Sequence, residues 1–407
     1  MQVNPYPAEF LTTNSNSTSK EIIGQIKTID HAINSGKIFN DSLFQGKLGL
    51  SLYHYSSFEY TGSEEHIQRG RNYLDEVFCK FNESGSSLLN PSLSNGLGGF
   101  MSLLNYLTKK QYIYQDLLEF EEIDKFLLKQ ALHQVEHDFN DYLHGAFGVL
   151  NYFIDRLPDP AIQLHAECLI EAILRKVVHT KQGSFIRNYF VSKEETSEIN
   201  LSLSHGQTGF ILVLLKAFEE GLLFEQLHDT IRSMISLLLK QTMPTDPENN
   251  RHSIFPNTVH EATREKTYNN RMGWCYGDLN QAFLLYKAGT SFGIKQYLEI
   301  ADLIGASSLD RLDISSTMCV DAQFCHGAAG IAAMYKSLFT ISGHAYYEKA
   351  SATWIQKCLE FLKRGNINLD YEDREMSLLE GLPGISLVLQ DAVYPNKGQW
   401  KEFFLIN

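Results

Sequence analysis

Seven one-sided apolar segments alternate along the chain with seven stretches that are apolar at most positions. In the one-sided segments the apolar residues recur at the spacing of an amphipathic helix. These segments cover residues 22–33, 74–81, 123–135, 164–177, 227–238, 297–304 and 347–362. Each of the more apolar stretches, such as 210–215, follows a short glycine motif. The pattern predicts seven amphipathic helices that alternate with seven more apolar helices.

The glycine motif is a sequence repeat. Its first glycine stands at positions 46, 96, 145, 206, 277, 327 and 381, and a second glycine follows three residues later in every copy but one, where Asn280 replaces it. Self-similarity at such a period indicates a repeat architecture. Glycine is unfavourable inside a helix but permits close backbone approach where a helix starts. We therefore expect seven helix starts to meet at one place.

The economical arrangement of these helices is an all-α fold, an α/α toroid. Seven inner helices, opened by the glycines, would lie inside a ring of seven outer helices. A linear solenoid would use the same helices but would leave the most apolar ones exposed along one side. The sequence therefore favours a closed double ring.

The toroid is expected to occupy residues 20–407 as a single domain. Residues 1–19 are polar and are predicted to form a flexible tail. Two excursions interrupt the repeats, at about 181–203 and 242–270, and the first contains a stretch with strand character at 184–191. Long loops inside a compact domain often act as lids or substrate platforms.

The composition of the chain bears on which partners it could bind and in which compartment it would work. The chain is 43% hydrophobic and 20% charged, which is typical of a globular protein. Its formal net charge of −13, without a basic stripe, argues against nucleic acid as a partner. No apolar run approaches the roughly 18 residues of a membrane span, no secretory signal is visible, and the six cysteines lack the spacing of a disulfide framework. We expect a soluble, cytoplasmic protein.

If the inner helices share an axis, the residues just before each first glycine form a polar ring around it. They are Gln45, Asn95, His144, His205, Tyr276, His326 and Glu380. The helices that they precede are apolar. A polar mouth on an apolar barrel is where a ligand site is expected.

Cys275 and Cys325 stand at the same position of adjacent repeats, and His326 follows Cys325 directly. A lone buried cysteine is usually an inert packing residue, but three sulfur and nitrogen ligands at matched positions predict a metal site. Thiolate and imidazole suit zinc rather than calcium or magnesium. Three protein ligands leave a fourth position open, as in catalytic zinc sites. The other four cysteines match no ring position and are predicted to pack in the core.

Other polar residues near the predicted mouth have two interpretations each. His205 is either an acid or base at neutral pH or a hydrogen-bonded core histidine. Asp141, three residues before His144, could orient a histidine, but its position alone favours a helix cap. Arg271 would bring a permanent cation to the mouth, although by position alone a surface arginine is the simpler reading. Trp274 is interpreted as a packing residue.

The motifs Ser-His-Gly-Gln-Thr-Gly at 204–209, Trp-Cys-Tyr-Gly at 274–277 and Cys-His-Gly-Ala-Ala-Gly at 325–330 resemble those of the lanthionine synthetase C-like (LanC-like) cyclases. The resemblance covers nearly the whole chain and implies an α/α toroid with zinc at its mouth. By motif position it implies zinc ligands at Cys275, Cys325 and His326, an acid or base at His205 and the active-site aspartate at Asp141. The arginine and tyrosine that flank the first zinc cysteine fall on Arg271 and Tyr276. One departure is Asp278-Leu279-Asn280 where the family usually has Pro-Gly, which puts the local geometry of that helix start in question.

The resemblance implies a stand-alone lanthipeptide cyclase. Zinc would favour the thiolate of a peptide cysteine, which would attack dehydroalanine or dehydrobutyrine to form a lanthionine or methyllanthionine ring. Arg271 would stabilise the enolate and His205 would protonate the α-carbon. The expected partners are a dehydrated precursor peptide and, from the same pathway, a dehydratase and an exporter.

Four alternatives stay open at this point. They are a LanC-like protein that adds or binds glutathione, a zinc-dependent prenyltransferase-like toroid, a peptide-binding scaffold with structural zinc, and an α/α-barrel glycosidase. The prenyltransferase-like toroid would favour six repeats and a carboxylate ligand, whereas seven repeats and two thiolates are found. The glycosidase is disfavoured because no carboxylate pair stands out in the ring.

Overall fold

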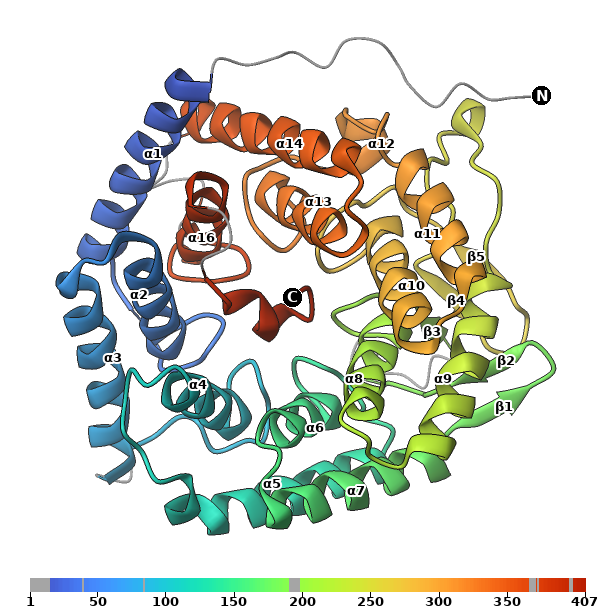
Figure 1. Ribbon diagram of the computed structural model, residues 1–407, viewed down its shortest axis with the longest axis horizontal. Coiled ribbons are helices and arrows are strands. Elements are labelled where there is room, and N and C mark those ends of the chain that lie inside the picture. Colours follow the sequence, from blue (N-terminus) through green and yellow to red (C-terminus); the bar gives the residue numbers. More distant parts are fainter. Residues whose placement is uncertain are drawn as a thin grey trace.

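Two concentric rings of helices make up the part of the chain that the computed structural model describes, which is residues 15–38, 40–82, 85–189, 198–365, 371, 373–394 and 398–407 (Figure 1). The outer helices in this part are α1 (Ser15–Ser35), α3 (Glu64–Asn82), α5 (Glu121–Glu136), α7 (Pro160–Arg175), α9 (Phe224–Leu239), α11 (Lys295–Ser307) and α14 (Ala345–Arg364). The inner helices are α2 (Lys47–Thr61), α4 (Leu97–Lys109), α6 (Ala146–Asp155), α8 (Gln207–Glu219), α10 (Asp278–Phe292), α13 (Ala328–Ser342) and α16 (Leu382–Val393). The predicted all-α toroid is confirmed.

The inner ring closes on itself. Each inner helix contacts the next, and the last, α16, packs against both α2 and the first outer helix, α1. Side chains join α16 to α2, since Gln390 donates to Ser57 Oγ at 3.0 Å and Tyr53 lies 3.3 Å from Ser386 Oγ. Because the first and last inner helices touch, the linear solenoid is wrong.

The outer helices are one-sided, as the apolar spacing predicts. In α14, for example, Tyr347, Trp354 and Cys358 are buried against the inner ring. Leu164 is an exception, because on α7 it is 67% exposed although it falls on the predicted apolar stripe. Of the predicted tail, residues 15–19 are helical and belong to α1, and residues 1–14 lie outside the described chain. No helix in the described ranges is long and apolar enough to cross a membrane.

The loops that precede the inner helices are joined around the ring by main-chain hydrogen bonds. At six neighbouring pairs of loops an amide of one loop donates to a carbonyl of the next. The bonds run from Leu43 to Ser94, Ser94 to Leu143, Leu203 to Cys275, Cys275 to Cys325, Cys325 to Leu379 and Leu378 to Phe44, over 2.7–3.2 Å. At the remaining pair, the Leu143 amide donates to the carboxylate of Asp141 instead, at 2.9 Å. Among the described residues, side chains join the loops at this seventh junction, since His205 Nδ1 lies 2.8 Å from the Asp141 carboxylate.

The second glycine of the motif lets the first helical turn approach its own loop. At Gly330, a Cβ atom would lie 1.7 Å from the Phe324 carbonyl oxygen, so only glycine fits. The copy with Asn280 starts its helix differently, because Gly277 has φ +120° whereas the other six first glycines have φ between −103° and −149°. The Asn280 amide then donates to the Trp274 carbonyl at 2.7 Å. This helix start therefore differs from the other six, at the position where the departure from Pro-Gly puts the local geometry in question.

The two excursions form small sheets beside the ring. Strands β1 (Val178–Thr180) and β2 (Gly183–Phe185) make an antiparallel hairpin. Strands β3 (Glu198–Asn200), β4 (Thr258–His260) and β5 (Lys266–Thr267) make an antiparallel sheet in the order β3-β4-β5, with Ile199 opposite Val259. The first excursion is thus partly extended, although residues 190–197 of the predicted stretch lie outside the described chain.

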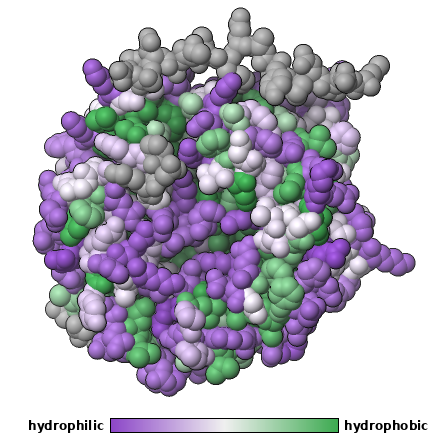
Figure 2. Space-filling model, viewed as in Figure 1, coloured by the Kyte–Doolittle hydropathy of each residue, from purple (hydrophilic) through white to green (hydrophobic). Residues whose placement is uncertain are grey.

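The C-terminal segment lies at the centre of the inner ring (Figure 1). Its short helix η3 (Trp400–Phe404) is packed among aromatic side chains, and the Phe404 ring lies 5.4 Å from that of Trp274. The Trp274 indole donates to the Phe404 carbonyl at 2.8 Å, and Tyr142 donates to the Phe403 carbonyl at 2.9 Å. Polar residues surround the centre of the face seen in Figure 2. The barrel is therefore a filled core, and Trp274 packs as expected.

The remaining short helices are peripheral. They are η1 (Leu117–Phe120), η2 (Pro247–Asn249) and α12 (Ile314–Thr317). Helix α12 lies against the loop that carries Cys275, because the Met272 amide donates to the Thr317 carbonyl at 3.0 Å.

Candidate metal centre and acid-base pair

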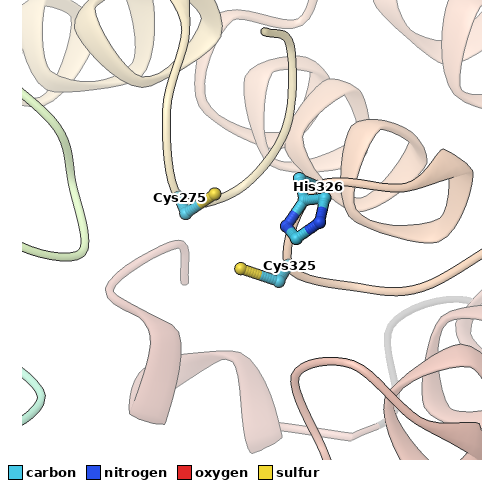
Figure 3. Close-up of side chains that lie close together, drawn as sticks. All are labelled: Cys275, Cys325 and His326. Atoms are coloured by element: carbon cyan, nitrogen blue, oxygen red, sulfur yellow. The ribbon is translucent and has the colours of Figure 1, made fainter. Parts of the chain in front are cut away.

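Cys275, Cys325 and His326 point toward one another from two neighbouring loops (Figure 3). The two sulfurs and one ring nitrogen of His326 all lie within 4.8 Å of one another. The loops are held together by the bond from the Cys275 amide to the Cys325 carbonyl, at 3.1 Å. The repeat positions thus place the three side chains together, as the sequence predicts.

The donor set fits a zinc ion. Two sulfurs and an imidazole are ligands that zinc accepts, and three of them leave room for a fourth. The Nδ1 atom of His326 is buried and has no hydrogen-bond partner among the described residues, which is costly unless a ligand such as a metal meets it. Hydrogen bonding with Cys325 lowers the pKa of the Cys275 thiol well below its usual range, and the same bond raises that of Cys325. One thiolate is thus already favoured at this site.

The other ring nitrogen of His326 is held by Gln323. Its Nε2 atom lies 3.1 Å from the Gln323 side-chain nitrogen, which also donates to the Asp321 carboxylate at 2.7 Å. Gln323 is buried. This contact restrains the orientation of the His326 ring. Nδ1 is therefore the nitrogen that would face a metal.

Asp141 and His205 form a second group at the neighbouring loops. The Asp141 carboxylate is fully buried, and its Oδ2 lies 2.8 Å from His205 Nδ1. Its Oδ1 accepts the amides of Leu143 and His144, both at 2.9 Å. Asp141 thus caps its own loop and also pairs with the histidine, so both roles considered for it from the sequence are present.

The two histidines at this junction are driven toward different charge states. Burial disfavours the charged form of His205, but the hydrogen bond to Asp141 and the charges of Asp141 and Cys275 together outweigh it, so the pKa of His205 is raised. Burial lowers the pKa of His144, whose ring stacks on that of His205 with 6.2 Å between centroids. A pair of titratable groups with separated pKa values is typical of an acid-base site.

The acid-base pair is adjacent to the metal centre. The Ser204 amide lies 3.5 Å from the Cys275 carbonyl, so His205 comes directly after a residue in contact with the ligand loop. The charge of Cys275 is also one cause of the raised His205 pKa.

Arg271 and Tyr276 flank Cys275 on its loop. The Tyr276 hydroxyl accepts a bond from the Asn200 amide at 2.8 Å, and burial raises its pKa. Arg271 is half-buried, its Nε has no hydrogen-bond partner among the described residues, and its charge helps to lower the pKa of Cys275. Arg271 is therefore not the surface residue that its position alone favoured. Its catalytic role and that of Tyr276 stay predictions.

In four copies of the repeat a serine stands four positions before the first glycine, at Ser42, Ser92, Ser202 and Ser377. In the other three copies this position is occupied by Asp141, Gly273 and Gln323. Asp141 pairs with His205, and Gln323 holds His326. Gly273 leaves space for the metal centre, because a Cβ there would lie 2.7 Å from the Cα of His326. Gln323 and Gly273 were missed as site residues, and aligning the seven copies at this position would have found both.

The prediction that the remaining cysteines pack in the core is partly wrong. Cys319 and Cys358 are buried, but Cys79 and Cys168 are exposed on outer helices. Neither exposed cysteine belongs to the site.

A second group with metal-ligand chemistry lies on α1, α2 and α3. The Nδ1 atoms of His54 and His66 are 3.0 Å apart, with Asp30 nearby. Asp30 already accepts bonds from Tyr53 and Asn34. The histidine contact is within hydrogen-bond distance, so this group is explained as a hydrogen-bonded pair that joins helices.

Comparisons with known proteins agree with the fold. The family model described as "Lanthionine synthetase C-like protein" matches residues 37–405. The solved structure of nisin cyclase is similar, with a TM-score of 0.74 at 17% identity over 96% of this chain and 98% of that chain. A curated relative, "Glutathione S-transferase LANCL1" of Danio rerio, is 29% identical over 133 residues, which is 32% of this chain. The matched part spans only 30% of that relative's length.

Proposed function

The chain belongs to the lanthionine synthetase C-like family, and from this premise we propose that it is a zinc-dependent lanthipeptide cyclase. It would add cysteine thiols of a dehydrated precursor peptide to dehydroalanine or dehydrobutyrine in the same peptide. The observation that carries the proposal is the convergence of Cys275, Cys325 and His326 within 4.8 Å beside the Asp141–His205 pair. Thiol activation and proton transfer are the two tasks of the reaction, and the site holds chemistry for both.

Cys275, Cys325 and His326 would hold the zinc ion. When bound, zinc supplies positive charge that favours the thiolate form of an incoming thiol, whose pKa is otherwise about 8.5. Arg271 adds a permanent positive charge on the same loop and is suited to stabilise the enolate oxygen that develops on the peptide. The two ligand loops are fixed by main-chain bonds, so the donors are preorganised.

His205 is the proposed proton donor. The addition forms one carbon–sulfur bond and one carbon–hydrogen bond across the double bond, with no leaving group. Because Asp141 raises the pKa of His205, a larger fraction of the ring carries the proton at neutral pH. Asp141 bonds Nδ1, so Nε2 is the nitrogen from which the proton would pass to the α-carbon of the peptide.

The test is mass spectrometry of a dehydrated precursor peptide after incubation with the zinc-loaded protein and alkylation of the remaining thiols. Cyclisation leaves the peptide mass unchanged but removes alkylatable thiols. His205→Ala is the informative variant, because it should keep zinc and lose turnover. Cys319→Ala is the matched control for the ligand variants, since Cys319 is buried but lies outside the site. Full retention of alkylatable thiols with the wild-type protein would refute the proposal.

A second candidate is the addition of glutathione to dehydrated residues. It is favoured by the partial match to the relative named glutathione S-transferase. The same incubation with glutathione present distinguishes the two, because this reaction increases the peptide mass by one glutathione per site. We propose the cyclase first because the similarity to nisin cyclase extends over 96% of the chain.

The partners follow from the proposed reaction. The substrate is a peptide in which serine or threonine has been dehydrated, so a dehydratase must act before this protein. An exporter of the same pathway would take the cyclised product. Thiol ligands and a thiol substrate would favour a reducing compartment such as the cytoplasm.

A further inference from the structure

The segment 186–189 crosses the one loop junction that has no main-chain bond of its own among the described residues. There the side-chain amide of Asn188 donates to Asp141 Oδ2 at 3.1 Å and to the His205 carbonyl at 2.9 Å. Both neighbours are acceptors, so the NH2 group of the Asn188 amide must face them. Asn188 thus contacts both members of the acid-base pair.

The segment itself is firmly held. Gln207 exchanges two hydrogen bonds with the main chain of Ile186, at 2.7 and 3.0 Å. Asn140 donates to the Arg187 carbonyl at 2.9 Å. The Arg187 guanidinium pairs with both oxygens of Glu261 on the second excursion, at 2.5 and 3.1 Å. Asn188 is therefore placed by anchored main chain, which gives its amide a fixed direction.

We propose that Asn188 is a positioning residue that fixes the Asp141–His205 pair for proton transfer. Its two bonds take over the task that main-chain hydrogen bonds perform at the other six junctions. One bond occupies the second acceptor site on Asp141 Oδ2, which keeps the carboxylate from rotating away from the ring. The other bond fixes the His205 main chain. The role in turnover rests on the proposed function, whereas the effect on His205 does not.

The first measurement is an NMR titration of the His205 ring in substrate-free protein, with the signal assigned from a His205→Gln variant. Among the described residues, the titratable groups around this ring include Asp141, His144 and Cys275. Asn188→Asp keeps the size of the side chain but adds a second carboxylate, which favours the charged ring and should move its midpoint to higher pH. Asn105→Ala is the matched control, because Asn105 donates one bond to the Asp155 carbonyl far from the pair. In Asn105→Ala the midpoint of the His205 titration should equal the wild-type value.

The second measurement is cyclisation kinetics with zinc content determined in parallel. Asn188→Ala should lower kcat by about tenfold or more while zinc stays stoichiometric, because acid-base catalysis contributes roughly 100- to 10,000-fold in total. Asn105→Ala should stay within about twofold of the wild type. An unchanged His205 titration in Asn188→Asp, or an unchanged kcat in Asn188→Ala, overturns the positioning role. If wild-type protein fails to cyclise the peptide but the His205 midpoint moves, the positioning role stands and the proposed function falls.

Discussion

Replacing Asp141 with serine would separate its two tasks. Serine occupies the equivalent position in four other loops, where its hydroxyl accepts an amide of the same loop, as Ser202 does from His205 at 3.0 Å. Asp141→Ser should therefore keep the cap on the His144 amide. It would remove Oδ2 and with it the bonds from His205 and Asn188. The loop is retained while the acid-base pair is lost.

The magnitude follows from the two lost bonds. A hydrogen bond to a charged group contributes about 1.5–3 kcal/mol, and part of this is offset because a buried carboxylate no longer has to be accommodated. We expect the free energy of unfolding to fall by roughly 1–3 kcal/mol. Cyclisation should fall by about 100- to 10,000-fold, the usual contribution of acid-base catalysis. The effect on activity should thus be far larger than the effect on folding.

The pH dependence gives an independent check. Asp141 raises the pKa of His205 above its unfolded value of about 6.5. The stabilisation from the pair is therefore fully present below that value and is lost as the pH rises through the higher folded pKa. Denaturant titrations of wild type and Asp141→Ser should differ more at about pH 6 than at about pH 9.

Ser42→Ala is the control, because it removes the cap on the Gln45 amide and a bond to the Asn40 side chain, in a loop away from the pair. It should cost about 1 kcal/mol and leave turnover and zinc content near wild type. If Asp141→Ser retained cyclisation within about threefold of the wild type, Asp141 would be a cap and nothing more.

Three further outcomes are expected. Cys275→Ala should abolish stoichiometric zinc in elemental analysis, whereas Cys319→Ala should not; a zinc-loaded Cys275→Ala protein would contradict the ligand set. Gln323→Ala should weaken zinc binding by about 10- to 100-fold in a chelator competition, because His326 loses the partner that orients it; an unchanged affinity would show that the ring is held by packing. Trp400→Ala should lower the free energy of unfolding by roughly 3–5 kcal/mol, because the indole is fully buried at the centre of the ring; zinc content should be unaffected, and a loss below about 1 kcal/mol would mean that the C-terminal segment adds little to the core.

The ring architecture could be predicted because each repeat carries the same local signal. Glycine pairs mark the helix starts, and the one-sided apolar segments mark the outer helices. The same periodicity aligns Cys275 with Cys325, so the candidate metal centre can be predicted from the sequence. Individual surface positions are less certain, as exposed Leu164 and Cys168 show, because an apolar residue at the edge of a stripe need not be covered.

Contacts between non-equivalent parts of the chain could not be predicted. Asp141 meets His205 across 64 residues, and only the ring geometry decides that they face each other. Asn188 lies in an excursion without repeat periodicity, so nothing in its surroundings marks it. The position of the C-terminal segment inside the barrel depends on its fit among aromatic side chains such as Trp274. Such long-range fits are set by tertiary packing and leave no local pattern.

The contact between α1 and α16 has a consequence for synthesis. Helix α1 is synthesised before the other helices of the two rings, yet the inner helix that covers its apolar stripe is synthesised after them. At translation speeds of roughly 5–20 residues per second, the stripe waits on the order of tens of seconds for its partner. During that time the ring is open and the apolar stripe of α1 is exposed to solvent. Chaperone binding to residues 15–35 would protect this stripe until α16 covers it.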